Sequence, residues 1–122
     1  MQNKILIIED EQNITRLLKV NLASARYIVD NACDGIEGLD KIKTFSPDLI
    51  VLDLRMPKLN GLEILKIIKA NPEFKSIKII ILTASDKKEN RTAAISMGAD
   101  AFLSKPVDLQ LFIEKVNCLL KT

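Results

Sequence analysis

The chain of 122 residues has the size of one domain with a single hydrophobic core. Hydrophobic residues make up 48% of it and charged residues 28%, as in ordinary globular proteins, and no apolar run approaches the roughly 18 residues of a membrane span. The net charge of +2 is scattered along the chain, which argues against binding to nucleic acid. We therefore expect one water-soluble domain over residues 1–122 that binds neither nucleic acid nor membrane.

The content of histidine and cysteine and the N-terminal segment exclude further classes of protein and of functional site. The chain has no histidine, which excludes imidazole metal ligands, Ser–His and Cys–His nucleophile pairs and any phosphohistidine of its own. Cys33 and Cys118 are too few for a disulfide framework or a metal knuckle, so we expect two small buried residues. An apolar run begins at Lys4 without a preceding leader, which predicts a cytoplasmic protein.

The N-terminal half alternates short apolar runs with amphipathic segments. Apolar residues that recur every three or four positions predict helices with one buried face, and Pro47 ends the second of these segments. In chain order, the predicted elements are a strand at Ile5–Ile8, a helix with a stripe from Ile14 to Ala25, a strand at Tyr27–Val29 and a helix with a stripe from Ile36 to Phe45.

The C-terminal half continues the same alternation. Pro72 and Gly98 mark the ends of two predicted helices, and the helix before Gly98 has the weakest apolar stripe, which predicts looser packing. In chain order, the predicted elements are a strand at Leu49–Leu52, a helix with a stripe from Leu62 to Ile68, a strand at Ile77–Leu82, a helix at Lys87–Met97, a strand at Ala101–Leu103 and a helix with a stripe from Leu109 to Leu119.

These elements predict an α/β fold. Most of the strands are apolar on both faces, which suits a parallel sheet covered by helices on both sides. Five strands, each followed by a helix through a right-handed crossover, give a doubly wound five-stranded parallel sheet with five helices.

Polar residues follow the predicted strands at the edge where such sheets bind ligands. Glu9 and Asp10 follow the first strand, Asp53 the third, Thr83 the fourth and Lys105 the fifth. Converging carboxylates repel one another unless a hard cation and an ammonium group compensate them, which predicts a Mg2+ site. A carboxylate there can act as a nucleophile toward a phosphoryl group while metal and lysine balance the charge.

Simpler interpretations remain for single positions. An acidic residue after a strand is often a helix cap or a solvated loop residue, and only the conjunction of these residues favours a site. Glu11 suits a negative charge at a helix N-terminus better than a further metal ligand. The side chain of Arg55 is expected to be solvated, and Met56 to Gly61 to form a turn in which Gly61 supplies backbone freedom.

Four stretches, covering nearly the whole chain in order and spacing, resemble the receiver domain of two-component response regulators. They are IIEDE at residues 7–11, DLIVLDLRMP at 48–57, LTA at 82–84 and GADAFLSKP at 98–106. The resemblance implies a flavodoxin-like topology with strand order 2-1-3-4-5. It also implies a phosphorylation-dependent switch that is not an enzyme acting on other substrates.

The resemblance further implies a role for each site residue. Asp53 would accept the phosphoryl group, Asp10 and Asp53 would bind Mg2+ directly, Glu9 would act largely through water, and the backbone carbonyl of Arg55 would complete the metal site. Glu9 stands where aspartate is more frequent, which lengthens one arm of that site.

Lys105 and Thr83 would bind the phosphoryl oxygens, and Phe102 would change position on activation, with Ala84 leaving it room. Lys105 would precede a cis peptide bond to Pro106. Phe102 stands where tyrosine is also common, so the switch would act through packing. The other interpretation of Phe102 is a permanently buried core residue.

The implied partners are a sensor histidine kinase or a histidine phosphotransfer protein, an output protein or domain, and a second copy in a phosphorylation-dependent homodimer. The alternative is a Mg2+-dependent aspartyl-phosphate phosphatase, but Asp53-Leu54-Arg55 lacks the second acid of the Asp-x-Asp motif. A dinucleotide-binding protein would need a glycine-rich loop after the first strand. A receiver-like scaffold without phosphorylation would be expected to lack Asp53 or Lys105.

Overall fold

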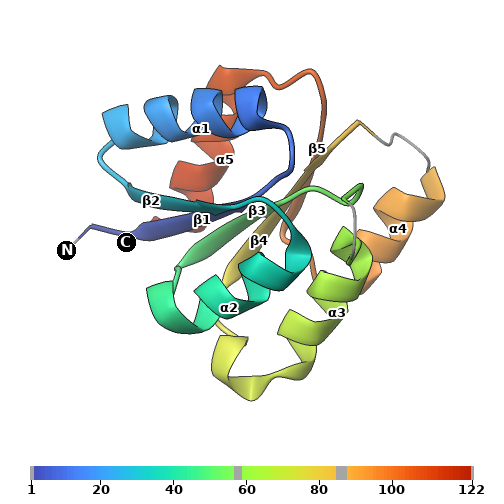
Figure 1. Ribbon diagram of the computed structural model, residues 1–122. Helices are drawn as coiled ribbons and strands as arrows, with labels where there is room; N and C mark the ends of the chain where they lie inside the picture. Colours follow the sequence, from blue (N-terminus) through green and yellow to red (C-terminus); the bar gives the residue numbers. More distant parts are fainter. Residues whose placement is uncertain (1, 57–58, 85–87, 122) are drawn as a thin grey trace.

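The computed structural model describes residues 2–56, 59–84 and 88–121, and five parallel strands form its centre (Figure 1). Each strand after the first is reached through a helix, and the order across the sheet is β2-β1-β3-β4-β5. This is the predicted order. The strands are β1 (Lys4–Ile8), β2 (Ile28–Ala32), β3 (Leu49–Leu52), β4 (Lys78–Thr83) and β5 (Ala101–Ser104).

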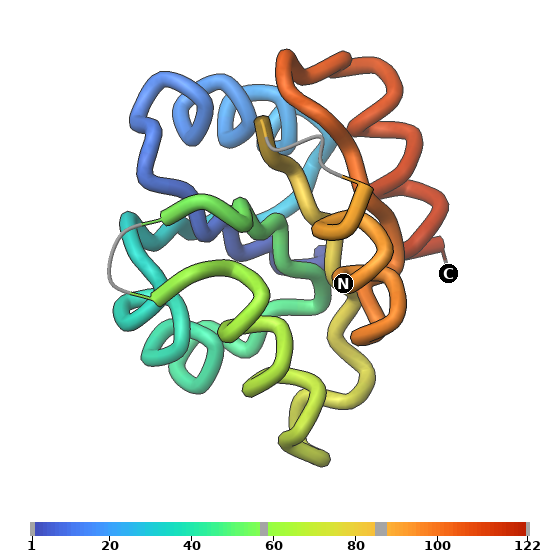
Figure 2. Tube along the Cα trace, turned by 90° about the vertical axis from the view of Figure 1, so that its right-hand side faces the viewer, coloured from blue at the N-terminus to red at the C-terminus, as the bar shows by residue number. Residues whose placement is uncertain are grey.

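Helices cover both faces of the sheet. Figures 1 and 2 show α1 and α5 on one face, with α2 and α3 on the other, and residues of α4 join the core of that second face. No helix in the described part of the chain is long and apolar enough to cross a membrane. The helices are α1 (Gln12–Ser24), α2 (Gly35–Phe45), α3 (Gly61–Ala70), α4 (Lys88–Ser96) and α5 (Leu109–Leu119), with a short 3-10 turn, η1 (Pro72–Phe74).

Alternate residues of the central strands belong to two hydrophobic cores, one on each face of the sheet. Ile5 and Ile7 of β1 pack against α1 and α5, whereas Leu6 and Ile8 pack against α2 and α3, and all four are fully buried. Successive side chains of a strand point to opposite faces, so a strand between two helical layers must be apolar throughout. The continuous apolar runs of the sequence therefore have a direct structural cause.

Side-chain caps fix the starts of three helices. Asp34 accepts a hydrogen bond from the Glu37 amide before α2, and Asn60 accepts one from the Glu63 amide before α3, at 2.9 and 3.0 Å. Asp108 accepts one from Leu111 before α5, at 3.1 Å. A side-chain cap satisfies a backbone N–H that the first turn of a helix leaves free, so these polar residues set where each helix begins.

The predicted elements are all present, and the bounds of several of them differ from the prediction. The strand predicted at Tyr27–Val29 begins one residue later and runs on through the polar pair Asp30-Asn31 to Ala32. The strand predicted to start at Ile77 starts at Lys78, and the η1 turn was not predicted. Lys87, the predicted first residue of the fourth helix, lies outside the described residues, as does Pro57 of the predicted turn.

The prediction that both cysteines are buried is wrong. Cys33 and Cys118 are free and exposed. Cys33 lies in the loop between β2 and α2, and Cys118 follows the buried Val116 by two positions on α5, which turns it away from the buried face of that helix. The prediction was based on the small size and low polarity of cysteine, which do not show whether a residue faces outward.

Candidate functional site

The parallel register brings four strand ends to one edge of the sheet. Ile8, the last residue of β1, pairs with Leu52, the last residue of β3, so that Glu9 and Asp53 follow at the same level. Beyond the strands, the Asp53 amide donates to the Ile8 carbonyl at 3.2 Å and the Lys105 amide to the Thr83 carbonyl at 2.9 Å. Residues far apart in sequence therefore meet where chemistry was predicted.

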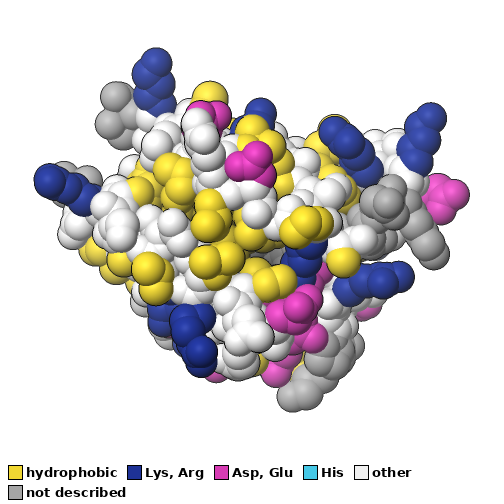
Figure 3. Space-filling model, turned by 90° about the horizontal axis from the view of Figure 1, so that it is seen from above, with side chains coloured by type: hydrophobic (Ala, Val, Ile, Leu, Met, Phe, Trp, Pro, Cys, Tyr) yellow, Lys and Arg dark blue, Asp and Glu magenta, His cyan; other side chains and the backbone are white. Residues whose placement is uncertain are grey.

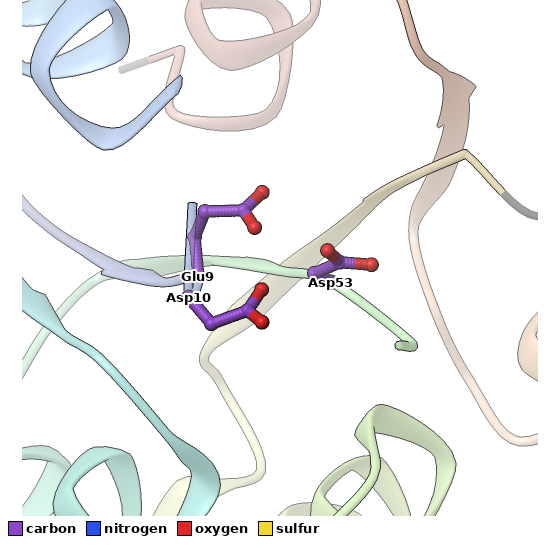
Figure 4. Close-up of side chains that lie close together, drawn as sticks. All are labelled: Glu9, Asp10 and Asp53. Carbon is purple, nitrogen blue, oxygen red and sulfur yellow. The ribbon is translucent and has the colours of Figure 1, made fainter. Parts of the chain in front are cut away.

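Three carboxylates form the acidic cluster, which consists of Glu9, Asp10 and Asp53. One oxygen from each can be chosen so that all three lie within 4.8 Å of one another. In Figure 4, Glu9 and Asp10 extend from the end of β1 toward Asp53 at the end of β3. Glu9 and Asp53 are buried, while Asp10 is exposed, so the cluster opens to solvent on one side.

Lys105 reaches into the acidic cluster from the end of β5. Its Nζ lies 2.9 Å from Glu9 Oε1 and 3.0 Å from Asp53 Oδ2, and its side chain is only 9% exposed. Nζ also lies 2.8 Å from Oε1 of Glu11, which is 58% exposed. The peptide bond from Lys105 to Pro106 is cis, as the family resemblance implied.

Backbone amides hold two of the carboxylates in place. The Arg55 amide donates to Asp53 Oδ1 at 3.0 Å, so that with Lys105 on Oδ2 both oxygens of Asp53 have a donor. The Glu11 amide donates to Glu9 Oε2 at 3.2 Å. Hydrogen bonds of this kind favour the charged form of a carboxylate and fix its orientation.

Burial and charge act against each other in the site. Burial raises the pKa of Glu9 to about 7; the Lys105 ammonium opposes this rise, and the charge of Asp53 adds to it. For Lys105, burial acts to lower the pKa, but the bonds to Glu11, Glu9 and Asp53 outweigh it and hold the pKa above its ordinary value. One ammonium thus compensates the buried carboxylates only in part.

Gly61 has a role that the sequence did not reveal. A Cβ added there would lie 2.6 Å from the Leu54 Cα and closer still to the Asp53 carbonyl oxygen. Backbone freedom, the expected role, does not explain this glycine. A glycine is needed because the start of α3 approaches the backbone of Asp53 closely. The spacing of residues in the sequence does not predict this approach, because the contact depends on how the loop between β3 and α3 folds back.

The remaining predicted residues lie around the acidic cluster. Thr83 is fully buried at the end of β4, and the exposed side chain of Arg55 agrees with the prediction of a solvated residue. Phe102 on β5 is partly buried and packs against the core, and the Arg91 guanidinium lies 5.7 Å from the centre of its ring. Phe102 is therefore not the fully buried core residue of the simpler interpretation.

The acidic cluster suits a divalent cation. Its donors are carboxylate oxygens, which hard cations such as Mg2+ prefer, and the exposed Asp10 leaves room for the water ligands that Mg2+ usually retains. The charge of the cluster also exceeds that of Lys105, so a bound cation would relieve repulsion. The residues present therefore fit the predicted metal.

An apolar surface adjoins the site. Seen from above, hydrophobic side chains gather over α1 and α5, and acidic side chains lie along one side of them (Figure 3). Leu17 and Val20 on α1 are 41% and 61% exposed. Large apolar side chains grouped on a surface are typical of a protein-binding face.

The chain is similar in sequence to known proteins over nearly its whole length. The family profile described as the response regulator receiver domain matches residues 5–117. The Response regulator ArlR of Staphylococcus aureus is 40% identical over 118 residues, which are 97% of this chain and 52% of that protein. This chain thus spans about half the length of that curated relative.

Solved structures give the same result. The chemotaxis protein CheY4 of Vibrio cholerae superimposes with a TM-score of 0.91 and 28% identity, covering 98% of this chain and 100% of its own. The receiver domain of the Francisella response regulator 1452 superimposes with a TM-score of 0.89 and 33% identity, covering 97% of this chain and 96% of its own.

Proposed function

This chain belongs to the response regulator receiver domain family, and from that premise we propose that Asp53 accepts a phosphoryl group and makes the domain a signalling switch. Receiver domains are regulatory domains of two-component systems and generally bind Mg2+ at an acidic site. The observation that carries the proposal is the Lys105 ammonium 3.0 Å from the buried Asp53 carboxylate, within the acidic cluster.

Transfer of a phosphoryl group to Asp53 needs a nucleophile and groups that neutralise the negative charge of the phosphoryl oxygens. An oxygen of Asp53 would attack the phosphorus in line with the leaving group, the bond from phosphorus to the donor would break, and its electron pair would leave with the donor. Lys105 would donate to the phosphoryl oxygens, and Thr83 at the end of β4 would add its hydroxyl. Mg2+ held by Glu9, Asp10, Asp53 and the Arg55 carbonyl would balance the charge of the oxygens.

A phosphohistidine donor would lie outside this sequence, because its 122 residues contain no histidine. We assign this role to a sensor histidine kinase or a histidine phosphotransfer protein in the cytoplasm. The apolar surface over α1 and α5, beside the acidic cluster, supports docking of such a donor there. Phosphorylation would then alter an interaction with an output protein or domain, or with a second copy of the chain.

Intact-mass measurement tests the proposal. With Mg2+ and acetyl phosphate, the wild type should gain the mass of one phosphoryl group, and Asp53→Asn should gain none. Asp40→Asn, which changes an exposed carboxylate of α2 in the same way, is the matched control and should be modified fully. An unmodified wild type would contradict the proposal, and sustained turnover of a phosphomonoester would support the phosphatase instead.

A further inference from the structure

Lys105 has no spare donor in this structure. A lysine ammonium carries three N–H groups. Three carboxylate oxygens surround the Lys105 Nζ: Glu11 at 2.8 Å, Glu9 at 2.9 Å and Asp53 at 3.0 Å. A phosphoryl group at Asp53 can therefore receive a hydrogen bond from Lys105 only if one of these three partners gives way.

The three partners differ in what their release would cost. Before transfer, Glu9 and Asp53 are both carboxylates whose side chains are 3% and 4% exposed, so either one, left without its ammonium, would be a buried charge with less compensation. Glu11 is 58% exposed, and its carboxylate can turn into water. Release of Glu11 therefore costs less than release of Glu9 or Asp53, so Glu11 is the partner that yields.

The position of Glu11 gives it no competing task within its helix. It is the N-cap residue of α1, yet its side chain makes no capping hydrogen bond. By contrast, the N-cap residues of α2, α3 and α5 all use their side chains to accept backbone amides. The Glu11 side chain instead forms an ion pair with Lys105, which lies 94 positions later in the chain.

We propose, on the basis of the function proposed above, that Glu11 is a positioning residue that holds Lys105 and competes with the phosphoryl oxygens for its ammonium. As a phosphoryl donor approaches the Asp53 carboxylate, Lys105 keeps its protons and exchanges the Glu11 carboxylate for a phosphoryl oxygen. The bond from Asp53 to phosphorus then forms while the bond to the donor breaks and its electron pair leaves with the donor. Glu11 thereby sets how readily the site accepts an anion, independently of Asp53 as nucleophile.

Beryllofluoride, an analogue of the phosphoryl group, tests the competition without turnover. In the presence of Mg2+, titration calorimetry should show Glu11→Gln binding it roughly two- to fivefold more tightly than the wild type, the range expected for the loss of a partly exposed ion pair. At limiting acetyl phosphate, phosphorylation should accelerate by the same factor. Glu114→Gln, which removes one charge from an exposed position of α5, should match the wild type.

Glu11→Asp separates contact from charge. This variant keeps the negative charge but withdraws the carboxylate by about one C–C bond, about 1.5 Å, which takes it out of reach of Lys105. It should therefore behave as Glu11→Gln does. If Glu11→Asp behaved as the wild type while Glu11→Gln bound more tightly, the effect would come from the local potential, and the competition for Lys105 would be refuted.

A crystal structure of the beryllofluoride adduct gives the direct readout. Lys105 should contact a fluoride, and the Glu11 carboxylate should lie beyond about 4 Å from Nζ, the limit of an ion pair. An intact Lys105–Glu11 pair in the adduct would overturn the inference. A wild type that gains mass while Glu11→Gln shows unchanged affinity would refute this inference alone, whereas a wild type that gains no mass would refute the proposed function and the inference together.

Discussion

At the scale of single residues, the site is a set of charges that compensate one another incompletely. Lys105 faces three carboxylates, and Asp10 adds a fourth that the ammonium does not contact in the described structure. Burial raises the pKa of Glu9 to about 7, because the negative charge of Glu9 is poorly stabilised in the site. A cation at the acidic cluster should therefore add to the stability of the fold.

Mg2+ should raise the melting temperature of the protein by several degrees. A ligand that binds only the native state stabilises it by about 1.4 kcal/mol at tenfold excess over its Kd. Asp10→Asn should lose most of the rise, because the exposed oxygen donor of the acidic cluster is gone. Calorimetric melting with and without Mg2+ measures the effect, with Asp40→Asn as the control that keeps it. A full rise in Asp10→Asn would show that Asp10 is not a ligand.

Gly61 should tolerate no side chain. Gly61→Ala should lower the free energy of unfolding by about 1–3 kcal/mol, because the new Cβ would meet the backbone of Asp53 and Leu54, which cannot move without distorting the site. Gly38→Ala is the matched comparison, since the three atoms nearest the new Cβ belong to the side chain of Ile8 and none to backbone, and alanine favours the helix. Urea unfolding of both variants measures the difference. Equal losses would argue against the close approach at Gly61.

The sequence predicted which residues meet at this edge of the sheet, because their positions follow from topology. Within two positions of the ends of predicted strands stand Glu9, Asp10, Asp53, Thr83 and Lys105, and parallel strands bring such positions together. The ion pair of Glu11 depends instead on the direction of two long side chains, and the role of Gly61 on the distance between two backbone segments. Neither quantity can be read from spacing, and so both were missed.

At the scale of elements, β4, α4 and β5 carry the proposed response. Ala94 is the only fully buried residue among the described positions of α4, which agrees with the loose packing predicted from its weak stripe. Arg91 of this helix lies over the ring of Phe102, which is partly buried on β5. A helix with so little buried surface can shift at low cost.

Thr83→Ala should uncouple phosphorylation from this response. The variant should still gain one phosphoryl group at Asp53, but it should lose the phosphorylation-dependent chemical-shift changes around Phe102 and any dimerisation that depends on them. The reason is that Thr83 supplies the hydroxyl proposed to turn toward the phosphoryl oxygens and free space for the ring. Shift changes in Thr83→Ala that equal those of the wild type would refute the coupling.

The bounds of elements were predictable where apolar pattern alone decides them. β1 and β3 lie in the middle of the sheet and match the predicted runs to within one residue. β2 lies at an edge, where polar residues are tolerated, and Lys41 donates to the Asn31 carbonyl at 2.5 Å and Asp30 at 3.2 Å there. Its polar half therefore carries no apolar signal, and the strand was predicted too short.

At the scale of the whole molecule, Tyr27 links the segment between α1 and β2 to the last helix, α5. Its hydroxyl donates to Asn117 Oδ1 on α5, while its own backbone leads into β2. Burial raises the pKa of Tyr27 above its ordinary value of 10.0. The neutral phenol is thus favoured in the folded state, and the unfolded chain releases the proton at lower pH.

The contribution of Tyr27 to stability should be present below about pH 10 and lost as the pH rises through its folded pKa. Tyr27 is the only tyrosine and the chain has no tryptophan, so the ultraviolet absorbance of the phenolate reports on this residue alone. The absorbance midpoint should lie above 10.0 in the folded protein and return toward 10.0 in urea. A folded midpoint at or below 10.0 would contradict the assignment.

The two exposed thiols make the native chain ready for site-specific labelling. Cys33 lies in the loop after β2, at the edge of the sheet that holds the acidic cluster, while Cys118 lies near the end of α5, at the opposite edge. Because neither thiol is part of the core, Cys33→Ser and Cys118→Ser should each leave a folded protein with one reactive position. A fluorophore at Cys33 can then follow binding at the acidic cluster, with the same fluorophore at Cys118 as the distant reference.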